Sequence, residues 1–155
     1  MARVLIVACG NPMRGDDGAA WQAAERLRQT LPTSLAEILT FHQFMPELAD
    51  VVSHADAVIF LDAAAKGTPG EVVCEPVGTA AVDSHFSHHL APSGVLALAE
   101  QLYGACPKAY VVSLCGECFE HGEKLSPVVF AAMPKFVRTV DQLVCELGRN
   151  SLTSK

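Results

Sequence analysis

A glycine-rich loop near the start of the chain carries two adjacent carboxylates. Residues 9–18 read Cys-Gly-Asn-Pro-Met-Arg-Gly-Asp-Asp-Gly. The spacing of Gly10 and Gly15 matches the first half of a phosphate-binding loop, which would continue with Lys and then Ser or Thr. This chain has Asp16 and Asp17 instead, and two carboxylates repel a phosphate and attract a cation. The loop therefore predicts a site for a metal ion or another cationic group.

Further ligand-type residues occur later in the chain. Asp62 follows an almost wholly apolar run, and a histidine cluster at residues 84–89 supplies His85, His88 and His89. A doubly wound sheet brings the carboxyl ends of neighbouring parallel strands into one crevice, so we expect Asp17 and Asp62 to converge there. Two carboxylates and one imidazole suit a divalent transition metal and leave positions open for substrate or water.

Each of these residues also has an ordinary structural interpretation. Asp16 or Asp17 can cap the helix that follows the loop, and Asp62 can begin a turn after its strand. A histidine-rich loop is commonly solvated surface. The metal-site hypothesis therefore depends on the convergence of all three groups.

A second constellation is Cys115-Gly-Glu-Cys118, with His121 close behind. Such a pair can chelate zinc or cycle as a dithiol. A structural zinc site usually needs two pairs, and the sequence has no second one. A redox pair usually stands at the start of a helix, whereas this one follows a strand. We expect the six cysteines to be reduced in a cytoplasmic protein.

The elements that would position these groups alternate along the chain. We expect strands at residues 3–8, 36–41, 55–61 and 109–114, and an edge strand at 71–77 because Pro76 cannot donate to a ladder. Helices are expected at 18–31, 46–54, 92–103 and from 127 to Gly148, with Pro134 bending or restarting the last one. This order predicts an α/β fold, a three-layer α/β/α sandwich around a mostly parallel sheet of about five strands. We expect one domain over residues 1–155, with 149–155 as a frayed tail.

Composition narrows the functional class. Half of the residues are apolar, 18% are charged and the net charge is −6, which favours a compact globular protein. Nucleic-acid binding would call for a basic face, and a membrane span would need about 20 apolar residues in a row. We therefore expect neither partner, and the lack of a signal-peptide pattern favours the cytoplasm.

Several segments together resemble one known family. The opening Val-Leu-Ile-Val-x-x-Gly-Asn-Pro-x-Arg-Gly-Asp-Asp-Gly is similar to the start of the hydrogenase maturation endopeptidases. The likeness continues at residues 58–63, at 87–90 followed by 95–98, and at 122–127. It thus spans nearly the whole chain in the right order.

The resemblance implies an enzyme that trims the C-terminal extension from the large subunit of nickel–iron hydrogenases. It also implies a metal site of two acidic residues and a histidine, which correspond here to Asp17, Asp62 and His88. His85 and His89 stand close to His88 and are alternatives for the third position. In this family the nickel is supplied by the precursor, so cleavage checks metal loading. Another divalent transition metal can stand in for it in vitro.

These observations predict a cytoplasmic endopeptidase whose partner is a nickel-loaded hydrogenase large-subunit precursor. A water polarised by the metal, or activated by a carboxylate such as Asp16, would attack the scissile amide. The alternatives are a metal-responsive binding or chaperone protein that uses the same ligands, and a thiol-redox protein that uses Cys115 and Cys118.

Overall fold

A five-stranded sheet forms the centre of the protein. The computed structural model describes residues 3–79 and 91–153, and the strands lie in the order β2-β1-β3-β5-β4. They are β1 (Val4–Cys9), β2 (Ala36–Phe41), β3 (Ala57–Ala64), β4 (Val72–Pro76) and β5 (Lys108–Cys115). All neighbours are parallel except β4, which runs antiparallel at the edge. The predicted edge strand with Pro76 and the mostly parallel sheet are both confirmed.

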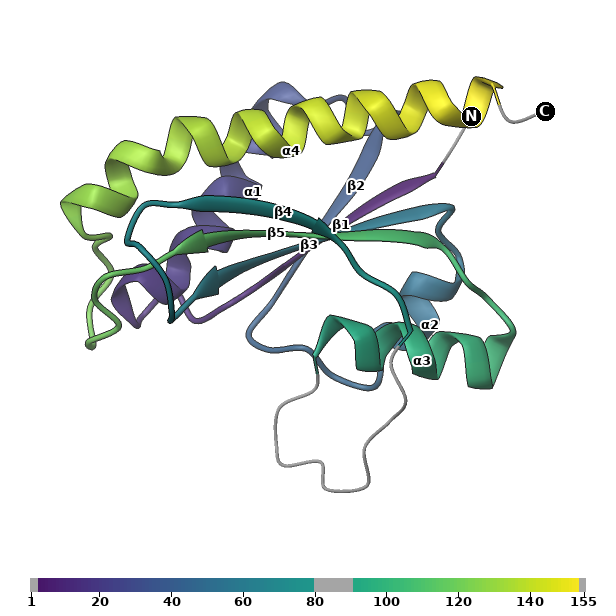
Figure 1. Ribbon diagram of the computed structural model, residues 1–155, viewed down its shortest axis with the longest axis horizontal. Helices are drawn as coiled ribbons and strands as arrows, with labels where there is room; N and C mark the ends of the chain where they lie inside the picture. The colour runs from purple at the N-terminus through teal and green to yellow at the C-terminus, as the bar shows by residue number, and fades with distance from the viewer. Residues whose placement is uncertain (1–2, 80–90, 154–155) are drawn as a thin grey trace.

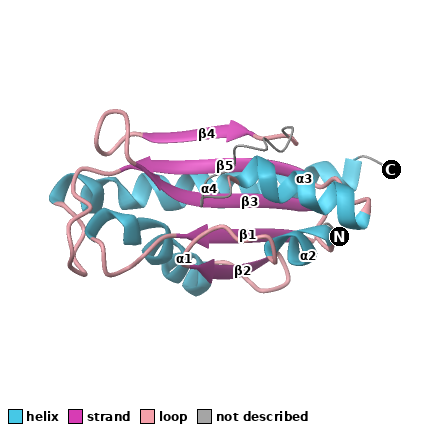
Figure 2. Ribbon diagram, turned by 90° about the horizontal axis from the view of Figure 1, so that it is seen from below, coloured by secondary structure: helices cyan, strands magenta, loops and turns pink. Residues whose placement is uncertain are grey.

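Helices cover both faces of this sheet. Helices α1 (Ala19–Thr30) and α4 (Pro127–Thr153) pack on one face, and α2 (Leu48–Ser53) and α3 (Pro92–Tyr103) pack on the other (Figures 1 and 2). A short 3₁₀ helix, η1 (Gly15–Gly18), leads into α1. The predicted three-layer sandwich is therefore confirmed.

Strand β1 shows why the sequence gives this arrangement. Every residue of β1 is buried, because helices cover both sides of the strand. Successive side chains point to opposite faces. Val4, Ile6 and Ala8 join the core under α1 and α4, while Leu5, Val7 and Cys9 join the core over α2 and α3.

The chain order places a crevice at the carboxyl ends of β1 and β3. From β1 the chain passes through α1 on one face to β2, and from β2 it passes through α2 on the other face to β3. The chain leaves β1 toward β2 on one side of the sheet and leaves β3 toward β4 and β5 on the other side, so the loops after β1 and β3 separate. Ligand sites of open α/β sheets lie at such a switch point.

Helix α4 differs from the prediction at two places. It runs as one helix through Pro134 and continues past Gly148 to Thr153, so residues 149–153 are helical and not a frayed tail. Pro134 has no N–H to donate to the carbonyl oxygen of Phe130, so one helical hydrogen bond is missing. Both residues are exposed, and water can solvate that oxygen. Near Gly148 the buried side chains of Val144 and Leu147 keep the helix packed against the core, and this packing overrides the weak propensity of glycine.

The helix that starts after η1 is not capped by either aspartate. Neither η1 nor α1 has a side-chain cap hydrogen bond, so the capping interpretation of Asp16 and Asp17 is wrong. Both carboxylates bind elsewhere, as described below. Within the described residues, no helix is long and apolar enough to cross a membrane.

Candidate active site

The loop after β1 folds back on itself and orients Asp17. The backbone N–H of Asn11 donates a hydrogen bond of 2.8 Å to Asp17 Oδ2. Gly10 has a φ of +152°, and a Cβ at this position would overlap the carbonyl oxygen of Asp17. Only glycine allows this close approach, so the glycine of the motif serves to place the carboxylate.

Asp62 reaches the same region from the neighbouring strand. It lies near the carboxyl end of β3, and its Oδ1 accepts a hydrogen bond of 2.9 Å from the N–H of Ala63. The pKa of Asp62 is raised to about 6: burial is the main cause, the hydrogen bond from Ala63 opposes it, and the negative charge of Asp17 adds to it. The two carboxylates are therefore close enough to interact electrostatically.

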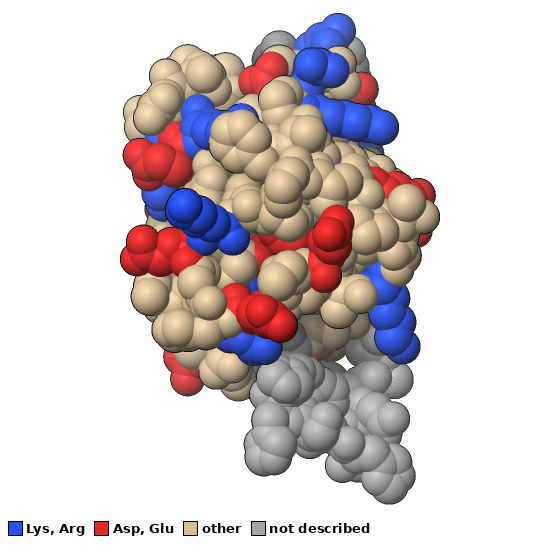
Figure 3. Space-filling view, turned by 90° about the vertical axis from the view of Figure 1, so that its left-hand side faces the viewer, with Lys and Arg blue, Asp and Glu red and all other residues tan. Residues whose placement is uncertain are grey.

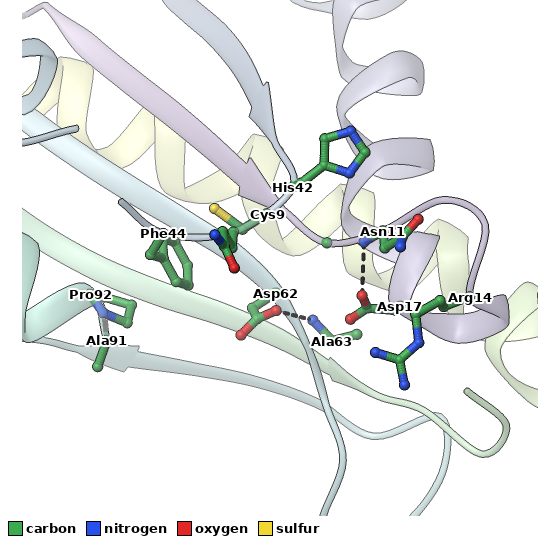
Figure 4. Close-up of a pocket in the computed structure, with 12 residues that line it drawn as sticks. Cys9, Asn11, Arg14, Asp17, His42, Phe44, Asp62, Ala63, Ala91 and Pro92 are labelled. Carbon is green, nitrogen blue, oxygen red and sulfur yellow. Dashed lines mark hydrogen bonds between the residues drawn. The ribbon is translucent and has the colours of Figure 1, made fainter. Parts of the chain in front are cut away.

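Asp17 and Asp62 line one pocket. Its volume is about 580 Å³, and Figure 4 shows both carboxyl groups in it, from the loop after β1 and from β3. The described lining residues are Cys9, Gly10, Asn11, Arg14, Asp17, His42, Gln43, Phe44, Asp62, Ala63, Ala91 and Pro92. The predicted convergence of the two aspartates at the switch point is thus what the structure shows.

The predicted third ligand falls outside the described part of the chain. His85, His88 and His89 all belong to residues 80–90, which the structure does not describe. The described segments on either side of this gap approach the site, since Ala91 and Pro92 line the pocket. Among the described residues, no three His, Cys, Asp or Glu side chains are grouped so that they could hold a metal ion.

Two further polar groups line the pocket from β1 and β2. Cys9 is buried at the end of β1, and its thiol pKa is raised, mainly by burial and further by the charges of Asp62 and Asp17. A protonated thiol is a poor nucleophile. His42 follows β2 and lines the pocket, and its ring centroid lies 5.1 Å from that of Trp21.

Solved structures of other proteins share this fold over nearly their whole length. The *E. coli* hydrogenase maturating endopeptidase HybD is 26% identical to this chain over 94% of each chain, with a TM-score of 0.77. The solution structure of an endopeptidase from *Escherichia coli* is also 26% identical over 94% of each chain, with a TM-score of 0.74. The [NiFe] hydrogenase maturation protease HycI from *Thermococcus kodakarensis* is 20% identical over 92% of each chain, with a TM-score of 0.75, and shows the fold. No protein-family model and no curated protein matches the sequence.

The chain resembles the hydrogenase maturation endopeptidases in fold and, at 26% identity to HybD, in sequence. It is accordingly a peptidase. The end of the molecule where β1, β3 and β5 finish carries acidic and basic side chains around a broad uncharged area (Figure 3). The pocket that Asp17 and Asp62 line belongs to this end of the sheet, and we take it as the candidate active site.

Asp16 does not belong to this site. Its side chain is fully buried and does not line the pocket. Oδ2 accepts hydrogen bonds from the N–H groups of Glu117 and Cys118 and from the hydroxyl of Ser126, and Oδ1 accepts one from the N–H of Ser126, all at 2.7–2.9 Å. With four donors already bound, this carboxylate is not placed to activate a water in the pocket, and that expectation is corrected.

Asp16 instead ties the loop after β1 to the loop after β5. Burial would raise the pKa of Asp16, but the hydrogen bonds from Cys118, Ser126 and Glu117 outweigh it and lower the pKa. Backbone bonds join the same two loops, since Gly15 N–H donates to Gly122 and Asp16 N–H donates to Cys118. The loop after β5, which carries Cys118 of the predicted thiol pair, therefore supports the loop after β1.

The cysteine pair lies apart from the pocket. Cys115 ends β5 and is buried, Cys118 is exposed, and both are free thiols. Neither lines the pocket. The Ser126 hydroxyl, one residue before α4, donates a hydrogen bond to Asp16.

Sequence reasoning assigned no role to Arg14, Cys9 or Phe44, all of which line the pocket. Cys9 and Arg14 both lie within the segment of residues 9–18, so their positions close to Gly10 and Asp17 were a usable signal. Phe44 packs edge-on against Phe60 with ring centroids 5.7 Å apart. No pattern in the sequence around residue 44 indicated that contact.

Proposed function

We propose that this enzyme removes the C-terminal extension of a nickel-loaded nickel–iron hydrogenase large-subunit precursor. The observation that carries the proposal is the placement of Asp17 and Asp62 in one pocket at the switch point of a maturation-endopeptidase fold. The relatives named above are hydrogenase maturation proteases by description. We place the activity in the cytoplasm, where the unprocessed precursor would be met.

In this proposal, Asp17 and Asp62 recognise the nickel that the precursor carries. Burial is the main cause of the raised pKa of Asp62, and the negative charge of Asp17 adds to it; a divalent cation between the two carboxylates would relieve that repulsion. His88 is the proposed third ligand. The remaining positions of the nickel stay with ligands of the precursor, so that the precursor without metal is bound only weakly.

The chemical step is hydrolysis of one peptide bond near the nickel. Binding the metal at Asp17 and Asp62 would hold the adjacent segment of the precursor in the pocket. A water polarised by the nickel then attacks the scissile carbonyl. Asp16 takes no part, because its oxygens are occupied by the loop after β5.

The test is to incubate the full chain with nickel-loaded and nickel-free precursor and to follow the mass of the precursor. We expect the mass to fall by that of the C-terminal peptide only for the loaded form. Asp17→Asn and Asp62→Asn should each slow cleavage by about 100-fold or more, the range found when a key charged group is removed. Asp141→Asn, on α4 and outside the pocket, is the matched control and should cleave normally.

Two outcomes would contradict the proposal. Equal trimming of loaded and nickel-free precursor would exclude nickel recognition as the basis of selectivity. Nickel-dependent binding with no change of mass would favour the chaperone-like alternative, in which the same ligands bind without hydrolysis.

A further inference from the structure

Arg14 brings a positive charge to a pocket that otherwise carries carboxylates. It lies three residues before Asp17 in the same loop, and among the described lining residues it is the one lysine or arginine. Figure 4 shows its guanidinium extending along the side of the pocket where the Asp17 carboxylate lies. The arrangement raises the question of what this cation binds.

No described residue binds the guanidinium of Arg14 by a hydrogen bond or an ion pair of 4.0 Å or less. The pocket carboxylates take their hydrogen bonds from backbone groups instead, Asp17 from Asn11 and Asp62 from Ala63. Arg14 therefore does not serve to neutralise Asp17 or Asp62, and its five donors remain available within the described part of the pocket.

The backbone that carries Arg14 is held on both sides. Its N–H donates to the carbonyl of Asn11 at 3.0 Å, and its carbonyl accepts from Asp17 N–H at 3.1 Å. Arg14 also pairs in a β-bridge with Gly122, next to the bonds that Asp16 makes to the same loop. These contacts restrict the backbone at residue 14, so the Arg14 side chain projects into the pocket from a fixed position. A binding group needs such a rigid attachment.

We infer that Arg14 binds the carbonyl oxygen of the scissile peptide bond and stabilises the negative charge that develops on it; this inference rests on the proposed peptidase function. Peptide substrates present carbonyl oxygens, and the two carboxylates of the pocket cannot donate to them. A guanidinium stays charged at every working pH and donates in a fixed fork. It is thus suited to an oxygen that becomes negative during the reaction.

The step can be written in full. The water oxygen bonds to the carbonyl carbon, and the π pair of the C=O bond moves onto the carbonyl oxygen, where Arg14 donates to it. One proton of the water passes to the amide nitrogen. When the C–N bond breaks, its electron pair stays on that nitrogen, and the C=O bond re-forms. The products are a carboxylic acid and an amine, with no other reactant needed.

The experiment measures kcat and KM for nickel-loaded precursor with the wild type, Arg14→Gln, Arg14→Lys and the control Arg138→Gln. Arg138 is an exposed arginine of α4 outside the pocket. Arg14→Gln should lower kcat by about 100-fold or more and change KM by less than about threefold. Arg14→Lys, which keeps the charge, should recover part of kcat. Thermal unfolding of each variant checks that the fold is intact, and no change is expected, because no hydrogen bond or ion pair joins the Arg14 side chain to another described residue.

The outcomes separate this inference from the proposed function. Cleavage by the wild type with an unchanged kcat in Arg14→Gln would overturn the role of Arg14 and leave the proposed function standing. A loss confined to KM would also overturn it, because Arg14 would then bind a part of the precursor that does not react. If neither the wild type nor Arg138→Gln cleaves the nickel-loaded precursor, the proposed function is wrong, and the role of Arg14 that rests on it is wrong as well.

Discussion

Asp16 and Asp17 are adjacent in the chain, yet their carboxylates have opposite surroundings. Asp16 is fully buried and accepts four hydrogen bonds from residues 117, 118 and 126. Among the described residues, the Asp17 carboxylate accepts a hydrogen bond from the N–H of Asn11, and it lines the pocket. One carboxylate therefore fixes the loop and the other is left for a ligand, and exchanging either for its amide should have a different consequence.

Asp16→Asn should destabilise the protein more than any other single aspartate change in this loop. The amide keeps only one acceptor oxygen, so its NH2 group would face either the N–H of Ser126 or the N–H groups of Glu117 and Cys118 and would leave those donors without their partner. We expect a loss of about 2–4 kcal/mol in the free energy of unfolding, measured by denaturant titration at neutral pH.

The pH dependence of this loss follows from the lowered pKa of Asp16. A carboxyl whose pKa is lower when folded stabilises the native state above its unfolded pKa, and that contribution disappears as the pH falls through the folded value. The gap between wild type and Asp16→Asn should therefore narrow in acid. A gap that stays constant down to about pH 2 would mean that the carboxylate charge plays no part.

Asp62→Asn should stabilise the protein while abolishing cleavage. The folded pKa of about 6 is above the ordinary 3.8, so above about pH 6 the folded state carries an unfavourable charge that the unfolded chain does not suffer from. Removing it should raise the free energy of unfolding by about 1–3 kcal/mol at neutral pH. Asn can still accept the bond from Ala63.

The stability gained by Asp62→Asn should depend on pH. As the pH falls from about 6 to 4, the folded wild type takes up a proton before the unfolded chain does and gains stability. The advantage of Asp62→Asn should then vanish, whereas Asp141→Asn should show no such pattern. An advantage that is the same at both pH values would contradict the raised pKa.

Gly10→Ala should displace Asp17. The added Cβ would overlap the carbonyl oxygen of Asp17 and would sit at a φ of +152°, which L residues rarely adopt. We expect a loss of about 1–3 kcal/mol in stability and a fall in cleavage rate of about 10-fold or more. The comparison is Gly148→Ala, where a Cβ meets nothing within 4 Å; in this helical position alanine should add about 0.5–1 kcal/mol and leave cleavage unchanged.

Cys118→Ser should leave cleavage within about twofold of the wild type. The thiol is exposed and outside the pocket, and the contacts of Cys118 with Asp16 are made by its backbone. Peptide mass and kcat for the nickel-loaded precursor are the measurements. Abolished activity would revive the thiol-redox alternative.

The sequence allowed most of the sheet to be predicted because its signals are local. Buried β-branched runs marked β1 and β3, and Pro76 marked β4 as an edge strand. Asp17 and Asp62 were also predictable, since Asp17 lies in the glycine-rich loop after β1 and Asp62 lies near the carboxyl end of β3. The role of Asp16 was not, because its partners lie about a hundred residues further along the chain. The end of α4 was misplaced for a similar reason: Gly148 is a local stop signal, but burial of Leu147 in the core outweighs it.

The most direct test of the central claim is the affinity of the enzyme for its precursor with and without nickel, measured by biolayer interferometry for the wild type and for the double variant Asp17→Asn/Asp62→Asn. We predict that the wild type binds nickel-loaded precursor at least about tenfold more tightly than nickel-free precursor, about 1.4 kcal/mol, and that the double variant binds both forms equally. A double variant that keeps the full preference for the loaded form would show that the two carboxylates do not bind the nickel.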